Sequence, residues 1–161
     1  MLFPATQTIV MQADADDLEP IADLHAQAFA RGWDTSELLA MKARAENTLL
    51  VARKVGFPKG PVAGFNIFRS TGAEAEILSI AVDPALRAAG LGTNLMREAI
   101  RHLRADRIPE LFLEVAETNT AAITLYKKLG FETVATRASY YSDPENPDQR
   151  VSALVMRMTI A

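Results

Sequence analysis

Two glycines and an arginine stand close together in this 161-residue chain, in the arrangement Arg87-x-x-Gly90-x-Gly92. The apolar, β-branched run from Ile77 to Val82 is typical of a buried strand, which Asp83-Pro84 ends, and a helix is expected to begin after the second glycine. Glycine lets backbone N–H groups approach a ligand, and the first turn of a helix offers unpaired donors at its positive end. The spacing predicts a phosphate-binding loop, although a tight turn with close helix–strand packing explains the same glycines.

Two familiar phosphate motifs do not fit this loop. A P-loop requires a lysine and a hydroxyl residue directly after its last glycine, whereas Thr93-Asn94 follow here. The dinucleotide-binding fingerprint requires a third glycine or alanine three positions after the second, where Leu95 stands.

A carboxylate and a tyrosine follow the loop. Glu114 lies inside the apolar run 110–116, a predicted strand whose alternation puts it on one face with Phe112 and Ala116, while the face of Leu111, Leu113 and Val115 is wholly apolar. A carboxylate with such neighbours needs a partner or water, and from the residues alone we favour an acid that reaches solvent. Tyr126 has the spacing of an ordinary core tyrosine on a helix, and Asn119 is a good helix N-cap.

The rest of the chain supplies the elements that must position these residues. Strands are expected over residues 8–11, 47–54, 62–69, 76–83, 110–116, 131–138 and 151–159, and helices over 14–32, 35–43, 91–106 and 120–129. Thr35 or Ser36 is expected to cap the second helix, Gly130 to end the fourth, and 57–61 to form a turn. The order β-α-α-β-β-β-α-β-α-β-β predicts an α/β (mixed α+β) fold with a mixed sheet, in a single domain over residues 1–161.

Composition limits the classes of function. The net charge of −3 offers no bulk attraction for nucleic acid. The chain has no cysteine, which excludes disulfides, thiolate metal sites and a thiol nucleophile, and agrees with a cytoplasmic location. Neither a signal peptide nor a membrane-spanning apolar run is recognised, so no membrane partner is expected.

Three other groups of polar residues have structural explanations. His25 and His102 lie on predicted helices near apolar positions, without the partners that catalysis or metal binding requires. The acidic run Asp14–Asp17 is expected to cap the first helix. No metal site is predicted.

The loop, placed after Ile-Ala-Val-Asp-Pro, resembles the acyl-CoA pyrophosphate loop of GNAT-type N-acetyltransferases. The second half of that family's core is similar to a segment of this chain that includes Leu113-Glu114-Val115, Asn119 and residues 122–131. The sequence of this segment, together with Trp33, Ser36 and Tyr140-Tyr141, resembles the RimI subfamily. Its members are bacterial enzymes that acetylate the N-terminal amine of a small-subunit ribosomal protein. The resemblance runs from about residue 76 to 141 and is weak before residue 30.

The resemblance implies a GNAT fold, with a mostly antiparallel sheet of about seven strands and about four helices, and acetyl-CoA as acetyl donor. It makes Glu114 the general base and Tyr126 the general acid toward the departing thiolate. The implied cofactor-binding residues are Ile80, Ala81 and Val82 for the pantetheine arm and thioester oxygen, Arg87, Ala88, Ala89, Gly90, Leu91, Gly92 and Thr93 for the pyrophosphate, and Asn119 for the pantetheine. Trp33, Tyr140 and Tyr141 are expected to line the acceptor groove.

The loop departs from its relatives at two positions. Many carry a basic or polar residue where Ala88 stands, and a tyrosine where Leu86 stands. These changes remove side-chain contacts to phosphate and leave the backbone donors in place, so weaker rather than lost CoA binding is expected.

The absence of cysteine excludes an acetyl-cysteine intermediate and favours direct transfer in a ternary complex. An α-amine titrates near 7.7–8.0 and a lysine near 10.4, so deprotonating lysine costs about 3 kcal/mol more and a single carboxylate suits an α-amine. A protein N-terminus, such as that of a ribosomal protein, is the first hypothesis for the acceptor, and a small amine or a lysine is the second. A non-catalytic acyl-CoA-binding module is the third, against which the presence of both Glu114 and Tyr126 argues. The oligomeric state is left open.

Overall fold

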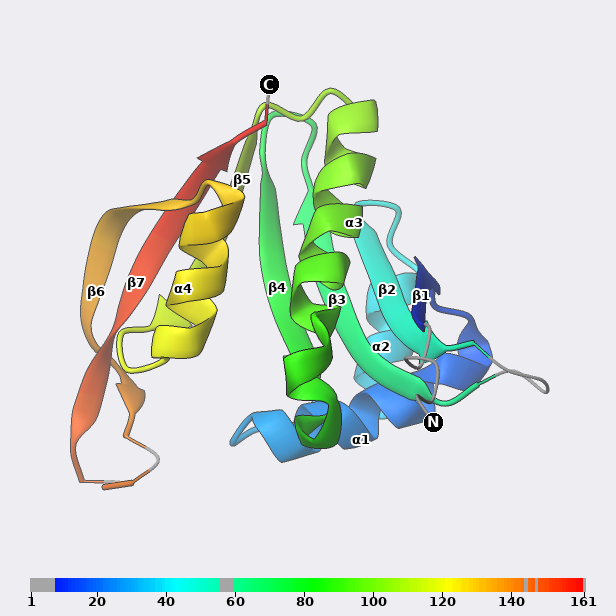
Figure 1. The fold of residues 1–161 in the computed structure, drawn as a ribbon, viewed down its shortest axis with the longest axis horizontal. Coiled ribbons are helices and arrows are strands. Elements are labelled where there is room, and N and C mark those ends of the chain that lie inside the picture. Colours follow the sequence, from blue (N-terminus) through cyan, green and yellow to red (C-terminus); the bar gives the residue numbers. More distant parts are fainter. Residues whose placement is uncertain (1–7, 56–59, 144, 147, 161) are drawn as a thin grey trace, which may run out of the picture. The chain divides into compact units, whose positions relative to one another are not determined.

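The structure is a computed structural model that describes residues 8–55, 60–143, 145–146 and 148–160 (Figure 1). Its helices and strands follow the predicted order. Their bounds are β1 Thr8–Gln12, α1 Leu18–Ala28, α2 Thr35–Lys42, β2 Asn47–Lys54, β3 Val62–Ser70, β4 Ala75–Val82, α3 Leu91–Ala105, β5 Glu110–Ala116, α4 Thr120–Leu129, β6 Glu132–Ser142 and β7 Arg150–Thr159. Short 3₁₀ turns, Ala15–Asp17 and Pro84–Ala89, precede α1 and α3. The turn predicted over residues 57–61 lies largely outside the described residues.

The strands form a seven-stranded sheet in the order β1-β2-β3-β4-β5-β7-β6. β4 and β5 are parallel, and the pairs β1–β2, β2–β3, β5–β7 and β6–β7 are antiparallel. A parallel pair needs a crossover connection, which contains α3. The predicted mixed, mostly antiparallel sheet is therefore confirmed for the described residues, together with the four helices.

Contacts along the chain divide it into two compact units. The first comprises residues up to Arg69 and Leu78–His102, and the second comprises Ser70–Ile77 and the residues from Leu103 onward. β4 contributes to both units, and its first two residues pair with Leu111 and Phe112 of β5 within the second unit. The single domain predicted over residues 1–161 stays a prediction.

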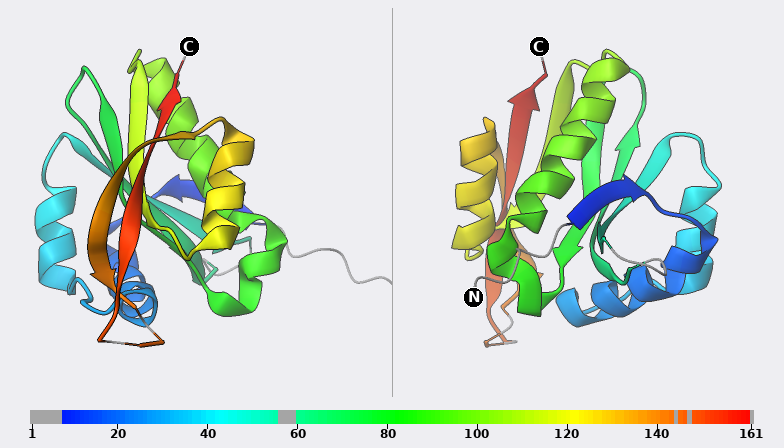
Figure 2. Two further views of the ribbon diagram at one scale, coloured as in Figure 1. Left: turned by 90° about the vertical axis from the view of Figure 1, so that its left-hand side faces the viewer. Right: turned by 45° about the vertical axis from the view of Figure 1, so that its right-hand side comes forward.

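Helices cover both faces of the strands in the first unit, because the side chains of a strand point alternately to its two faces (Figure 2). On β3, Phe65 and Ile67 enter a buried cluster with α1, α2 and β2, whereas Gly64 and Asn66 contact α3. The buried cluster consists of Ala13, Leu18, Ile21, Leu24, Leu38, Leu49, Val51, Phe65 and Ile67. The alternation within β3 thus fixes which helices lie on which face.

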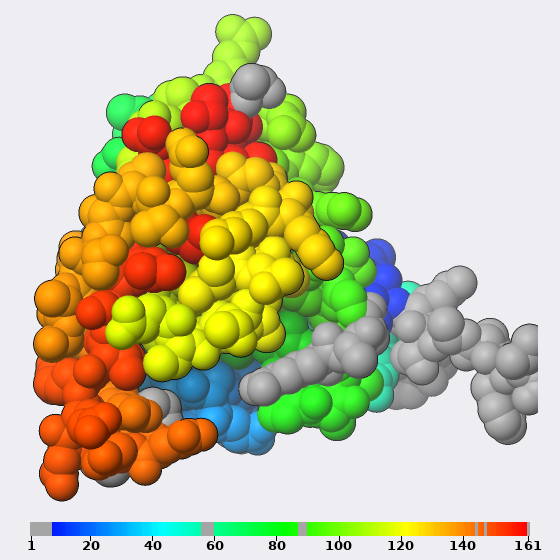
Figure 3. Space-filling model, turned by 60° about the vertical axis from the view of Figure 1, so that its left-hand side comes forward, coloured from blue at the N-terminus to red at the C-terminus, as the bar shows by residue number. Residues whose placement is uncertain are grey.

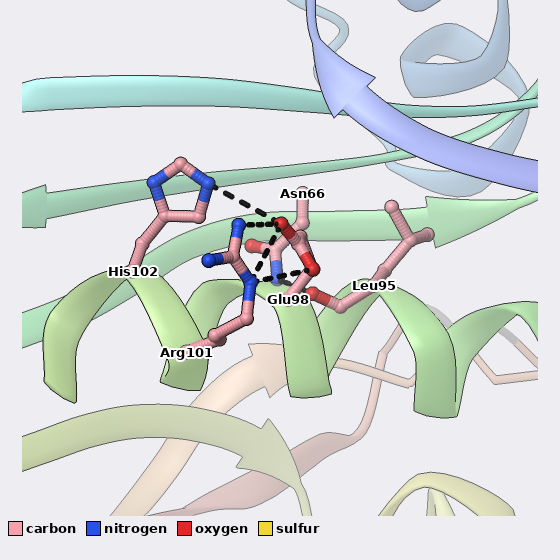
Figure 4. A network of polar contacts seen from close by, with 5 residues as sticks. All are labelled: Asn66, Leu95, Glu98, Arg101 and His102. Atoms are coloured by element: carbon pink, nitrogen blue, oxygen red, sulfur yellow. Dashed lines mark hydrogen bonds and ion pairs between the residues drawn. The ribbon is translucent and has the colours of Figure 1, made fainter. Parts of the chain in front are cut away.

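Two features bring α3 close to β3. The Asn66 side chain donates a hydrogen bond to the Leu95 carbonyl at 3.2 Å (Figure 4). Gly64 has no side chain, and a Cβ there would lie only 3.0 Å from the Ala81 carbonyl oxygen and 3.1 Å from Leu95 Cδ1. The absence of a side chain at position 64 therefore permits both the end of β4 and the first turns of α3 to approach β3.

His102 belongs to a polar network of α3 side chains next to the strands of the first unit (Figure 4). Glu98 accepts hydrogen bonds from Arg101, which hold the pKa of Glu98 below its usual range, and it lies 3.5 Å from His102 Nε2 (Figure 4). His102 also packs edge-on against Phe68. The structural role predicted for this histidine is confirmed.

The acidic run 14–17 caps the start of the first helical segment, as predicted. Asp14 and Asp17 form a capping box, in which the Asp17 carboxylate accepts from the Asp14 N–H at 2.9 Å. Asp17 is buried and also forms an ion pair with Arg53 at 2.5 Å. No group of three or more potential metal ligands occurs among the residues that the structure describes.

Three predicted boundaries are wrong by a few residues. α1 ends at Ala28 rather than near Gly32, because Phe29 is extended (φ −129°). Asp34, not Thr35 or Ser36, caps α2 and accepts from the Glu37 N–H at 2.8 Å. β6 continues to Ser142 rather than ending at 138, since a bulge lets it resume pairing with β7.

In the second unit, α4 packs beside β6 and β7 (Figure 3). Leu111, Leu113 and Val115 of β5 are buried and the alternate residues are half-buried, which confirms the predicted alternation. Gly130 ends α4 with φ +107°, as expected of a C-cap glycine. None of the helices found in the described ranges is long and apolar enough to cross a membrane.

Candidate active site

The predicted phosphate loop lies in the first unit, between β4 and α3. Asp83 starts it by accepting a hydrogen bond from the Ala85 N–H at 3.0 Å, and the 3₁₀ turn Pro84–Ala89 follows. Gly90 then adopts φ +76° and ψ +16°, and α3 begins at the next residue. A Cβ on Gly90 would meet no atom within 4 Å, so backbone conformation rather than space calls for glycine.

This geometry leaves a set of backbone donors at the start of α3. The first bond of the helical pattern there runs from the Asn94 N–H to the Gly90 carbonyl at 3.1 Å. The N–H groups of residues 91–93 precede it and have no acceptor within the helix, which is the arrangement that favours an anion at the positive end of a helix dipole. The side chains of residues 87–89 lie outside the described part, so the contacts expected of Arg87 and the effect of Ala88 stay predictions.

Ile80, Ala81 and Val82 form the end of β4 and are half-buried. Their strand leads into the loop through a hydrogen bond from the Asp83 N–H to the Ala63 carbonyl at 2.8 Å. The strand end and the loop are therefore held by the same neighbour, β3. The predicted pairing of this strand end with a pantetheine arm stays a prediction.

Glu114 lies in the second unit, on β5, with 29% of its side chain exposed. Its carboxylate oxygen Oε1 is 3.0 Å from Nε of Arg137, a residue of β6. The acid is thus neither a freely solvated strand-end charge nor a buried charge without a partner. The arginine was not foreseen from the sequence, because its approach to Glu114 depends on how β6 pairs with β7.

A bulge in β6 shapes the surroundings of this ion pair. The register with β7 shifts between Arg137 and Tyr141, and Ser139 adopts a left-handed conformation with φ +55°. Arg150 of β7 donates to the carbonyls of Ser139 and Tyr140 at 2.9 and 3.2 Å. These bonds satisfy carbonyl groups that the shifted strand does not pair, and so hold the bulge.

The predicted acceptor tyrosines lie at this bulge. The guanidinium of Arg137 lies 5.3 Å from the ring centre of Tyr140, whose side chain meets that of Tyr141 edge-on at 5.0 Å. Burial, followed by the Glu114 and Tyr140 charges, raises the pKa of Tyr141. Glu114, Arg137, Tyr140 and Tyr141 are hereafter called the carboxylate cluster.

Tyr126 and Asn119 are both on α4 of the second unit. Only 7% of Tyr126 is exposed, its ring packs edge-on against Phe131, and burial raises the pKa of its phenol to about 12. Asn119 caps α4 by accepting from the Ala122 N–H at 3.2 Å. The core packing and the capping that the residue types favoured are both observed, while their cofactor contacts stay predictions.

Trp33 lies in the first unit, in a set of stacked rings. Its ring is parallel to that of His25 at 4.4 Å, and its backbone N–H donates to His25 Nδ1 at 3.0 Å. His25 also meets Phe29 and Phe65 at 4.5 and 6.0 Å. His25, Phe29, Trp33 and Phe65 are hereafter called the histidine cluster.

His25 is 3% exposed, and burial lowers its pKa, with Glu37 opposing that shift. Burial thus favours the neutral imidazole, whose Nδ1 accepts the hydrogen bond from the Trp33 N–H. Its structural role was predicted, but its bond to the Trp33 segment was not.

The structure thus sorts the predicted site residues by unit. Glu114, Tyr140 and Tyr141 come together in the second unit, which also contains Asn119 and Tyr126. The strand end 80–82, the loop 87–93 and Trp33 belong to the first unit.

Comparisons with known proteins agree with these features. The profile of the acetyltransferase (GNAT) family matches residues 18–131. The chain is 31% identical over 150 residues to the [ribosomal protein bS18]-alanine N-acetyltransferase of Haemophilus influenzae, covering 92% of this chain and 97% of that protein. It is 37% identical over 102 residues to the protein of the same name from Escherichia coli K12, covering 63% and 67% of the two chains. A crystal structure of the ribosomal-protein-S18-alanine N-acetyltransferase from Escherichia coli superimposes with a TM-score of 0.82 at 28% identity, over 96% of this chain and 95% of that one.

Proposed function

Because this chain belongs to the acetyltransferase (GNAT) family and is an acetyl-CoA-dependent N-acetyltransferase, we propose that it acetylates the α-amine of a protein N-terminus. The N-terminal alanine of ribosomal protein bS18 is the first acceptor to test. The observation that carries the proposal is the similarity to an alanine N-acetyltransferase over nearly the full length of both chains. A cytoplasmic location fits such an acceptor and a chain without cysteine.

Acetyl-CoA supplies the acetyl group as a thioester, and we assign its pyrophosphate to the loop of the first unit. The start of α3 offers N–H groups without acceptors in the helix, and Gly90 turns the chain into it at φ +76°. The strand end at residues 80–82 would hold the amide-bearing arm through its backbone, as a sheet edge holds a peptide. The donors at the start of α3 and at the strand end are backbone groups, so the side chains at Ala88 and Leu86 do not change them.

Glu114 would accept the proton of the attacking amine, directly or through a water molecule. An α-amine has a pKa of about 7.7–8.0, so roughly a tenth of it is already neutral at pH 7 and the remaining demand on the base is small. The contact with Arg137 engages Oε1 of Glu114, and the Oε2 atom is the one we assign to the amine or water. A half-exposed carboxylate next to two tyrosines fits an acceptor brought from solution.

Tyr126 would donate a hydrogen bond to the departing thiolate. With its pKa raised to about 12, complete proton transfer to a thiolate of pKa about 8.5 is uphill by about 5 kcal/mol. A buried neutral phenol instead stabilises the charge that develops on sulfur as a pre-placed donor. We therefore propose that Tyr126 acts as a hydrogen-bond donor to the thiolate, rather than as the full general acid that the resemblance implies.

The acceptor is tested with three synthetic substrates and acetyl-CoA. The first is a peptide with the bS18 N-terminus, the second is the same peptide with its α-amine blocked and a lysine added, and the third is a polyamine. We expect mass spectrometry to find acetylation of the first substrate on its α-amine and little on the others. Turnover confined to the lysine or the polyamine would replace the proposed acceptor with the second hypothesis. Acetyl-CoA binding without turnover on any substrate would favour the non-catalytic module.

The cofactor loop is tested with a matched pair of glycines. Gly90 and Gly72 both have positive φ, at +76° and +93°, and a Cβ on either would meet no atom within 4 Å. Their replacement by alanine imposes similar strain of about 1–2 kcal/mol. We expect Gly90→Ala to weaken acetyl-CoA binding in calorimetry about fivefold or more, and Gly72→Ala to leave it unchanged. Equal affinities for the two variants would contradict the loop assignment.

A further inference from the structure

We propose that Arg137 is a positioning residue for Glu114, which holds one carboxylate oxygen so that the other faces the acceptor amine. This inference rests on the proposed function, in which Glu114 is the general base. It assigns a role to a residue of β6 that contacts the carboxylate and not the reacting atoms.

The geometry of the contact is the first argument. Arg137 Nε is 3.0 Å from Oε1 of Glu114, within the range of a charge-assisted hydrogen bond. A free glutamate side chain samples several rotamers, and a base must be held within a fraction of an ångström of its working position. A bond to one oxygen restricts the rotation of the carboxylate and leaves the second oxygen as acceptor.

The arginine is itself held in place. Its guanidinium lies over the Tyr140 ring at 5.3 Å, a cation–π arrangement. The following residues form the bulge in which Ser139 has φ +55°, a conformation that non-glycine residues seldom adopt. Arg150 fixes that bulge with two hydrogen bonds to its carbonyls. The position of Arg137 is therefore specified by backbone geometry and by a neighbouring ring.

Stability does not explain this ion pair. The Arg137 side chain is 55% exposed, and exposed ion pairs contribute about 0–1 kcal/mol. The sheet contains a second exposed ion pair between strands, Arg157 of β7 with Glu132 of β6 at 3.6 Å, and the Glu132 side chain is 72% exposed. What distinguishes the pair of Arg137 is its partner, because the Glu114 side chain is only 29% exposed.

The test is a double-mutant cycle on the full chain, with acetyl-CoA and the bS18 N-terminal peptide. We expect Arg137→Gln to lower kcat about tenfold with the KM for acetyl-CoA unchanged. In a Glu114→Gln background the same change should alter kcat by less than about twofold, because Arg137 then has no carboxylate to orient. Arg137→Lys, which keeps the charge without the planar fork, should recover part of the loss.

Arg157→Gln is the matched control, and it should leave kcat and the melting temperature unchanged. The same factor lost from Arg137→Gln in both backgrounds would overturn the inference in favour of a general structural effect, as would an unchanged kcat in the single variant. A Glu114→Gln variant with normal turnover would instead remove the base assigned in the proposed function, and the positioning role with it. The two failures are thus distinguishable.

Discussion

The histidine cluster of the first unit and the carboxylate cluster of the second are both built from aromatic rings around one titratable group. In the first, His25 is 3% exposed and its Nδ1 is used by the Trp33 backbone. In the second, Glu114 and Tyr140 are 29% and 45% exposed, and the partner of the acid is a solvated arginine. The titratable group of the first cluster is enclosed by the fold, whereas the carboxylate of the second is still partly exposed to solvent beside its partner.

The two clusters also differ in how much they contribute to the free energy of folding. Large aromatic side chains contribute about 1.5–3 kcal/mol when buried, so the histidine cluster supports the first unit. An exposed ion pair contributes about 0–1 kcal/mol, so the carboxylate cluster adds little to folding. Changes in the two clusters should therefore affect different measurements, namely unfolding in one case and turnover in the other.

The largest effect is expected from Glu114→Gln. General bases contribute about 100- to 10,000-fold, so kcat should fall about 100-fold or more near neutral pH. The variant keeps its volume and loses only a half-exposed charge, so its melting temperature and its affinity for acetyl-CoA should stay the same. Steady-state kinetics, calorimetry and thermal unfolding check these three quantities. Unchanged turnover at saturating acceptor would exclude Glu114 as the base.

The next effect compares Trp33→Ala with Tyr140→Ala. Loss of the half-buried tryptophan should lower the free energy of unfolding by about 2 kcal/mol, because it leaves a gap beside His25. Loss of the exposed tyrosine should change stability by about 0.5 kcal/mol or less and raise the KM for the acceptor peptide. Urea unfolding of both variants measures the two changes in the free energy of unfolding. Equal destabilisation by both would remove the distinction between the clusters.

Trp33 also offers a direct optical measurement, since it is the only tryptophan in the chain. If it lines the acceptor groove as predicted, the bS18 N-terminal peptide should change its fluorescence in a saturable way. A signal that does not respond to the peptide, with turnover intact, would assign Trp33 to the core alone.

A smaller effect is expected from Tyr126→Phe, which removes one hydroxyl from a buried ring. If the phenol only donates a hydrogen bond to the developing thiolate, kcat should fall by about tenfold, with stability nearly unchanged. Thioester donors whose thiols have different pKa values provide the sharper test. The loss should be greatest for the most basic thiolate, and a loss independent of the leaving group would contradict the assignment.

The smallest effect is a pH dependence of stability. Burial lowers the pKa of His25, so between that lowered pKa and about 6.5 the unfolded chain binds more protons than the folded one. The stabilising contribution of the neutral histidine is complete above about pH 6.5 and declines as the pH falls below it. The difference in unfolding free energy between the natural chain and His25→Gln should shrink from pH 7 to pH 5. A constant difference would show that the Trp33 segment tolerates a charged His25.

Local signals in the sequence determined the order of the elements, the alternation of β5 and the glycines that begin α3 and end α4. These depend on periodicity and backbone preference, which neighbouring residues specify by themselves. The phosphate loop and the candidates Glu114 and Tyr126 could be named for that reason, with the family resemblance supplying their roles.

Only the tertiary structure decided the partners of those residues. Arg137 reaches Glu114 across β7, through a register that shifts twice along β6. His25 accepts its bond from Trp33 because α1 ends early and the chain turns back over it. Neither contact follows from periodicity, because a register shift changes which side chains meet without altering the local pattern. The sequence therefore determined which residues are able to do chemistry, and the packing of strands and helices decided which charges and rings surround them.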